Sequence, residues 1–167
     1  MSLNEQISQT LAAMKGFSSE SPRAVGWTAE GGPTVEADLT AVDSLSCALR
    51  ELRIGAPELA AAPIEALREW ANQVCQRVTY LLEPVGSLEA DTEARAVLIR
   101  STPPATIEGR KAFYEMWVKA PGVVSLRRYL RAPGAGERQA IDLQITQEAL
   151  LKLVRDIIDA IPALQAA

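Results

Sequence analysis

Residues 63–79 read PIEALREWANQVCQRVT, and this stretch decides the fold class of the chain. On a helical wheel its apolar side chains fall within about 140° of arc, and polar side chains fill the opposite side. The apolar set is Ile64, Leu67, Trp70, Ala71, Val74, Cys75 and Val78. A helix with so wide an apolar face packs on something large and flat, so we expect it to lie on a sheet. Pro63 suits the first position of that helix.

Two further helices are predicted, one at each end of the chain. Ser2 and Glu5 form an S-x-x-E capping box, which predicts a helix from about Leu3 that ends at Lys15-Gly16. Thr146 is expected to cap a final helix over 147–161, whose apolar face spans about 160°. That face consists of Leu150, Leu151, Leu153, Val154, Ile157, Ile158 and Ile161.

The remaining segments follow a period of two, which is typical of strands. Strands are predicted at 34–42 and 45–54, with a turn at Asp43-Ser44 and a bulge near Leu52. One bent strand or a partly helical segment also fits 34–54, since Leu39, Val42 and Leu45 have helical spacing. Later strands are expected at 95–101, 111–119, 123–131 and 139–145, with a tight hairpin at 120–122 and a looser turn at 133–136. We expect Pro84 and Gly86 to interrupt the strand after the central helix, and 102–104 to stop the next. Residues 24–29 form a weak strand candidate and 17–22 a linker.

This order of helix, about three strands, helix, about five strands and helix predicts the α+β class. We expect an antiparallel meander with the helices packed on it. Residues 1–167 are long enough for a single domain, with 1–22 as a candidate N-terminal helical arm plus linker.

The element order of the first half, together with the acidic charge, is similar to that of the small acidic chaperones of type III secretion. The resemblance implies a dimer that binds extended segments of client proteins. It covers about the first half of the chain, and the strands expected after 63–79 depart from it.

Composition excludes several classes of function. The chain has no histidine, which removes catalytic Ser-His-Asp and Cys-His groups and histidine-ligated metal sites. The net charge of −4 and the lack of a long apolar run argue against nucleic acid and membrane as partners. No secretory signal is recognisable, so a cytoplasmic location is expected. Cys47 and Cys75 are expected to be buried hydrophobic residues. No motif indicates a cofactor, a metal or a catalytic residue.

A basic cluster lies on and beside the predicted hairpin of 111–131. Such a cluster could hold phosphate, an acidic partner or a nucleic-acid backbone. The interpretation we favour is a solvated sheet face, balanced across strands by Glu115, Glu137 and Asp142. The pair Glu36/Asp38 is likewise expected to be exposed to solvent. The cluster comprises Arg110, Lys111, Lys119, Arg127, Arg128, Arg131 and Arg138.

Residues 111–119, KAFYEMWVK, are the most informative strand for function. Phe113, Glu115 and Trp117 share one face of this strand. The residues between them, at the even positions of 112–118, form the other face. A solvated sheet face does not normally carry two large aromatic rings. Either this face is covered within the subunit, for example by the N-terminal helix, or Phe113 and Trp117 meet a partner.

Three functional hypotheses follow. The first is a non-enzymatic protein-binding, adaptor or chaperone-like domain whose partner, or second copy in a homodimer, meets Phe113 and Trp117. The alternative is a small-molecule-binding domain with a cavity between the sheet and the central helix, near Trp70, Tyr80, Tyr114 and Arg128. An enzyme would need a buried carboxylate or tyrosine of shifted pKa in that cavity, and no residue pattern indicates one.

Overall fold

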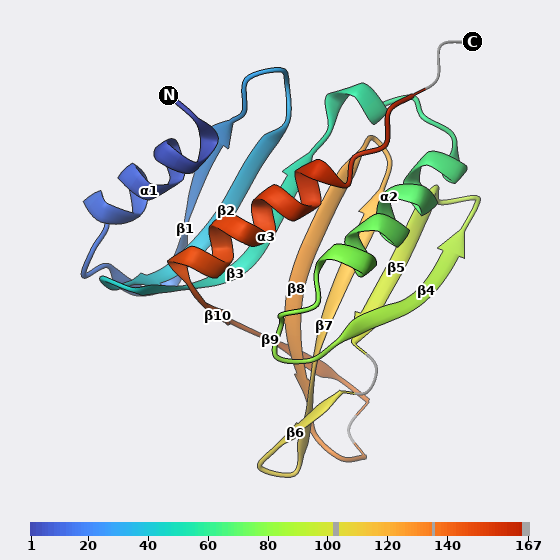
Figure 1. Cartoon of the computed structure of the whole chain (residues 1–167). Helices are drawn as coiled ribbons and strands as arrows, with labels where there is room; N and C mark the ends of the chain where they lie inside the picture. The colour runs from blue at the N-terminus through green and yellow to red at the C-terminus, as the bar shows by residue number, and fades with distance from the viewer. Residues whose placement is uncertain (102–103, 135, 165–167) are drawn as a thin grey trace.

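In the computed structural model, which describes residues 1–101, 104–134 and 136–164, three α-helices pack on one face of a ten-stranded antiparallel sheet (Figure 1). The predicted α+β class and the order of elements are confirmed. The helices are α1 (Leu3–Ala13), α2 (Ile64–Arg77) and α3 (Gln147–Asp159), and a 3₁₀ turn, η1 (Pro57–Leu59), precedes α2. The strands are β1 (Ser18–Thr28), β2 (Thr34–Val42), β3 (Ser46–Gly55), β4 (Val85–Asp91), β5 (Ala96–Ser101), β6 (Ala105–Ile107), β7 (Arg110–Lys119), β8 (Val123–Arg131), β9 (Arg138–Ile141) and β10 (Leu143–Thr146).

The main path of the sheet runs β1-β2-β3-β8-β7-β5-β4. Strand β6 pairs with β7, β9 pairs with β8, and β10 pairs with β3. Strands β3 and β8 pair over a short stretch, from Leu52 opposite Leu126 to Gly55 opposite Val123. Beyond that point β10 continues along β3 and β9 continues along β8, so this last part of the chain joins the two halves of the sheet.

The single strand predicted over 139–145 is therefore wrong, because Asp142 divides it into two strands with different partners. The Asp142 carboxylate accepts hydrogen bonds from Thr40 Oγ1 at 2.9 Å and from Arg50 Nε at 2.8 Å. Both partners lie where the register of β2 and β3 is irregular. These bonds hold Asp142 where the chain passes from β8 to β3, and such tertiary contacts leave no period in the local sequence.

The hairpin predicted over 34–54 is confirmed as β2 and β3, and so is the bulge. Asp38 pairs with Glu51 and Leu39 with Leu49, which leaves Arg50 as the extra residue of β3. In the turn, Asp43 Oδ1 accepts the backbone N–H of Leu45 at 2.8 Å and of Ser46 at 2.6 Å. Leu45, the first residue of the strand predicted at 45–54, instead lies in this turn and is exposed.

The central helix packs on the sheet as predicted, and its Trp70 is the largest fully buried side chain among the described residues. Trp70 Nε1 donates a hydrogen bond to the backbone oxygen of Ile157 in α3 at 2.9 Å, so the indole also fixes α2 against α3. Pro63 is the N-cap of α2 and not its first residue. Helix α3 begins after Thr146, whose side chain caps it as expected.

At the N-terminus the predicted helix is confirmed, but the linker is wrong. Both hydrogen bonds of the Ser2/Glu5 capping box are present, Ile7 and Leu11 are buried, and the helix contacts β1 and α3 of the same chain. Residues 18–22 begin strand β1, since Ser18 pairs with Ala41. The pairing shifts between Ser18 and Arg23, and this irregularity accommodates Pro22, which has no N–H to donate.

In the second half, one expectation holds only in part, one strand was not expected, and two expectations fall partly on residues outside the described ranges. The strand after α2 starts after Pro84 and continues through Gly86, where its pairing with β5 is irregular, so Gly86 disturbs the strand without ending it. Strand β6 was not predicted, because three residues are too few to show a period. The stop predicted at 102–104 and the turn at 133–136 include residues that lie outside the described ranges. The hairpin of β7 and β8 is confirmed.

Candidate functional site

The face of the sheet opposite the three described helices is the candidate site, and we call it the open face (Figure 1). On β7, Ala112, Tyr114, Met116 and Val118 are buried on the helix side. Phe113, Glu115 and Trp117 lie on the open face, as the alternation predicted.

A row of charged side chains crosses the open face from β5 to β2, and its charges alternate from Arg100 as far as Glu51. Arg100 pairs in register with Glu115, Glu115 with Arg127, and Glu51 with Asp38. An ion pair between Arg127 and Glu51 completes this charged row. Glu115 and Glu51 are only 2% and 5% exposed, so both carboxylates are enclosed by the cations around them.

Each of these two carboxylates has at least two cationic partners. Glu115 accepts from Arg138 and from Trp117 Nε1 at 3.0 Å, and Arg100 Nε lies 3.5 Å from it. Glu51 accepts from Arg53 and Arg127. These contacts account for the burial of two charged groups on a face without a helix.

Arg53 is the most highly connected cation. Its guanidinium donates to both carboxylate oxygens of Asp38 at 3.0 Å and to Glu36 at 3.1 Å. Hydrogen bonds from Arg53 hold the pKa of Asp38 below its usual value, and the Asp38 carboxylate raises the pKa of Arg53. The expectation that Glu36 and Asp38 are simply solvated is therefore wrong for Asp38, which is half-buried in this pair.

The charged row encloses a polar pocket of about 310 Å³. Trp117, half-buried, forms part of its wall. Its charged lining is Glu51, Arg53, Glu115, Lys119, Arg127 and Arg138. With four cations and two carboxylates, the pocket favours an anionic group or a carboxylate-bearing side chain.

Next to the charged row lies a pair of stacked aromatic rings. Phe113 and Tyr129 are cross-strand partners with ring centroids 5.8 Å apart. The guanidinium of Arg131 lies 5.9 Å from the Phe113 ring and that of Arg138 lies 3.9 Å from the Tyr129 ring. Phe113 and Trp117 thus share the open face, two strand positions to either side of Glu115.

Beyond the rings, Lys111 pairs with Arg131 and Arg131 with Arg138. This end of the sheet holds a groove of about 440 Å³. We call it the basic groove and define it by Arg100, Lys111, Phe113 and Arg131.

On the helix side, the four residues predicted around a ligand cavity are not all brought together. Tyr80 and Tyr114 line a pocket of about 210 Å³, and the Arg128 guanidinium lies 5.2 Å from the Tyr114 ring centroid. Arg128 forms a buried ion pair with Glu83. Trp70 instead fills the core between α2 and α3. Burial raises the pKa of Tyr80 and of Tyr114, and Tyr80 donates to Asp156 at 2.7 Å.

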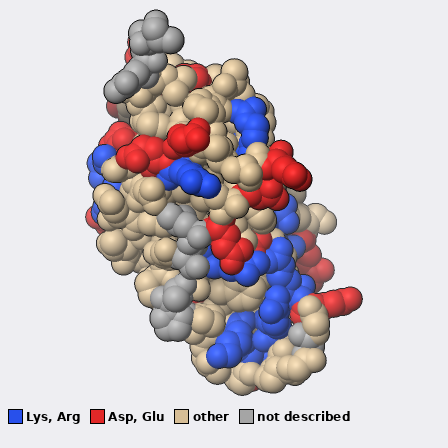
Figure 2. Space-filling model, turned by 90° about the vertical axis from the view of Figure 1, so that its right-hand side faces the viewer, with Lys and Arg blue, Asp and Glu red and all other residues tan. Residues whose placement is uncertain are grey.

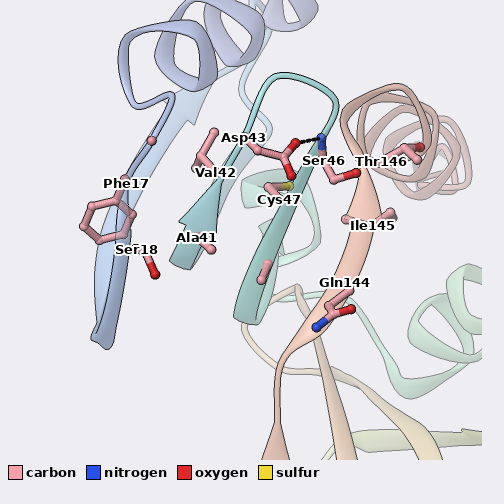
Figure 3. Close-up of a pocket in the computed structure, with 12 residues that line it drawn as sticks. Phe17, Ser18, Ala41, Val42, Asp43, Ser46, Cys47, Gln144, Ile145 and Thr146 are labelled. Atoms are coloured by element: carbon pink, nitrogen blue, oxygen red, sulfur yellow. Dashed lines mark hydrogen bonds between the residues drawn. The ribbon is translucent and has the colours of Figure 1, made fainter.

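A fourth cavity, of about 660 Å³, lies where β1, β2, β3 and β10 end (Figure 3). Most of its labelled side chains are small or apolar; the exceptions are Gln144 and Asp43, which accepts the backbone N–H of Ser46 in the turn. Cys47 contributes to the lining, and burial raises its pKa to about 11, so its thiol is not activated. Cys75 is a free, half-buried cysteine.

The sequence did not reveal that Glu51 and Glu115 are buried. Glu115 lay on the face predicted for Phe113 and Trp117, and Glu51 precedes the change of parity at Leu52. A carboxylate opposite arginines on neighbouring strands is the signal that would have found both, but it requires the register, which the sequence did not supply.

Comparison of the chain with protein-family models, with curated proteins and with solved structures finds no match. Within the described ranges, no three His, Cys, Asp or Glu side chains gather as ligands for a metal ion. None of the helices that the structure describes has the length and apolar character needed to cross a membrane.

Proposed function

We propose that this protein is a non-enzymatic binding domain whose open face takes a protein partner. One observation carries the proposal: Phe113 and Trp117 lie half-buried on a sheet face that no described helix covers. Aromatic side chains on an accessible face are typical anchors of protein interfaces.

The surroundings of the two rings support this proposal. Partly exposed arginines lie beside them, and Arg and aromatic residues are the types enriched at interfaces. The ion pairs fix the side chains of the charged row before any partner arrives, which lowers the entropy lost on binding. A second copy of this chain is the other occupant that this face would suit.

The small-molecule alternative has weaker support. The pocket beside Tyr80 and Tyr114 is small, at about 210 Å³, whereas ligand pockets usually have about 300–1,000 Å³. Trp70, which the alternative placed at the cavity, is occupied by its contacts with α3.

The proposal is tested by capturing partners from the source cell with the wild-type chain and with Trp117→Glu. Captured proteins are then produced in pure form and their affinities are measured by calorimetry. We expect Trp117→Glu to weaken binding at least about tenfold, as the loss of a central aromatic contact predicts. Leu82→Glu, at an exposed apolar side chain outside the strands, is the matched control. Equal affinity of Trp117→Glu and wild type would show that the open face is not the binding surface.

A further inference from the structure

We infer that the basic groove binds an extended acidic segment of the partner, in which one apolar side chain lies between two carboxylates. The inference rests on the proposed function and adds the chemistry of the segment that is bound.

The charge of the chain is strongly segregated. Residues 95–138 contain nine Lys and Arg but three Asp and Glu, a net charge of +6, so the other residues carry −10 of the total of −4. In Figure 2, Lys and Arg side chains gather at the lower end of the molecule, and most of the visible Asp and Glu lie elsewhere. An acidic segment is therefore attracted to one end of the protein and repelled from the rest.

Within this region, ion pairs inside the chain leave only some cations free. Arg127 pairs with Glu51, Arg128 with Glu83 and Arg138 with Glu115. Lys111 and Arg131 take part in no ion pair among the described residues. Both are exposed, and both line the basic groove. The groove therefore presents positive charge that the chain itself does not neutralise.

Arg100 supplies a third cation at the other end of the groove. Its Nε lies 3.5 Å from Glu115, and its side chain is 49% exposed. Glu115 already accepts a hydrogen bond from Arg138. Arg100 thus retains donors that face solvent and that a second carboxylate can accept.

The spacing of these groups matches an extended peptide. Lys111, Phe113 and Glu115 follow one another on the open face of β7, each about 7 Å from the next. Lys111 pairs with Arg131, and Glu115 pairs with Arg100. Along β7 the groove therefore presents the cations Lys111 and Arg131 at one end, the Phe113 ring in the middle and the cation Arg100 at the other end. A segment Glu-x-Leu-x-Glu has the same repeat, with its leucine on Phe113 and its carboxylates over Lys111/Arg131 and Arg100.

A nucleic acid fits this groove less well. Stacking of successive bases needs more than one free ring face, but Tyr129 is stacked on Phe113 on one side and has the Arg138 guanidinium 3.9 Å from its ring, which leaves Phe113 alone. The charge of −10 outside 95–138 also opposes a long polyanion. A short peptide needs only two or three cations.

The test uses a fluorescein-labelled peptide of about ten residues with a central Glu-x-Leu-x-Glu, followed by fluorescence anisotropy. We expect the wild-type chain to bind it, with affinity that falls as NaCl is added. A peptide with Gln in place of both Glu should bind at least about tenfold more weakly. This comparison uses the wild-type protein only, so it does not depend on the folding of any variant.

Lys111→Glu/Arg131→Glu should also lose about tenfold or more in affinity for the peptide. The matched control is Arg68→Glu/Arg155→Glu, which makes the same change in charge at exposed positions of α2 and α3 and should bind like wild type.

The inference is overturned if the groove variant and the control bind equally, or if the Gln peptide binds as well as the Glu peptide. It is also overturned if a single-stranded oligonucleotide of equal charge binds more tightly than the peptide. Self-association that Lys111→Glu/Arg131→Glu abolishes would identify a second copy as the occupant instead. A partner lost with Trp117→Glu but retained by the groove variant leaves the proposed function standing and refutes this inference. A partner retained by Trp117→Glu refutes the proposed function, whatever the peptide does.

Discussion

At the residue scale, the interior contains an ion pair of two buried charged side chains, Glu83 and Arg128. Glu83 is 2% and Arg128 7% exposed, and Glu83 Oε2 and Arg128 Nε find no hydrogen-bond partner among the described residues. Removing one member of a buried pair leaves an uncompensated charge, which costs about 3–5 kcal/mol. We therefore expect Arg128→Met to lower the free energy of unfolding by about that amount.

The double variant Glu83→Leu/Arg128→Met separates charge from packing. Replacing both members of a buried pair by apolar residues is often neutral or stabilising. Urea unfolding should show the double variant to be more stable than Arg128→Met. A double variant that is no more stable than the single one would mean that shape, and not the buried charge, dominates at this position.

Trp70 gives a prediction about the core. Its indole is fully buried and donates to Ile157 O, so Trp70→Ala should cost about 2–5 kcal/mol. Ile157→Ala should cost a similar amount. Asn72→Ala, on the exposed side of the same helix, should stay within about 0.5 kcal/mol of wild type. Chemical unfolding monitored by circular dichroism measures all three, and a small effect of Trp70→Ala would mean that α2 does not anchor the core.

Asp38, on the open face, makes the stability of the folded chain depend on pH. Its pKa is lowered in the folded state, so its stabilising contribution is present above the unfolded pKa and is lost as the pH falls through the folded value. Asp38→Asn should therefore destabilise the chain near pH 7, by less than about 1 kcal/mol for this partly exposed pair. The difference from wild type should disappear as the pH falls below about 4. Thermal unfolding across that range checks the sign, and a difference that grew on acidification would contradict it.

At the scale of elements, the hairpin of β7 and β8 is held against the chain before α2. Gly122 has φ +96°, and a Cβ there would lie 2.6 Å from the backbone oxygen of Ala56. Gly122→Ala should therefore destabilise by more than about 2 kcal/mol, since backbone strain and a steric clash act together. Gly134→Ala is the control, because Gly134 also has positive φ but has open space around it. Similar unfolding midpoints for the two variants would show that contact with Ala56 is unimportant.

Elements with a strong period were predicted from the sequence, and those fixed by distant contacts were not. Helices α2 and α3 each carry an apolar face with helical spacing. The hairpins β2–β3 and β7–β8 each carry apolar alternation and turn residues. Strand β1 does not, because most of its side chains are exposed and only its pairing with β2 orders residues 18–22. The break at Asp142 depends on Thr40 and Arg50, which lie 102 and 92 positions away along the chain, respectively.

In the candidate site, too, features with a local period were predicted and features set by distant contacts were not. The alternation of 111–119 was enough to place Phe113 and Trp117 on one face. Whether an arginine is free or paired depends on strand order, since Glu51 on β3 meets Arg127 on β8 only because those strands are neighbours. The sequence therefore located the basic cluster but could not separate Lys111 and Arg131 from the cations that are already neutralised.

At the scale of the whole molecule, the remaining question is what covers the open face. A homodimer would bring two open faces together around a two-fold axis, with Trp117 of each copy at the contact. We expect light scattering after size exclusion to give twice the chain mass of 18.0 kDa if this face self-associates, and Trp117→Glu to restore the single mass without loss of secondary structure. A particle of 18.0 kDa at micromolar concentration in both low and high salt would exclude the dimer and leave the face to another protein.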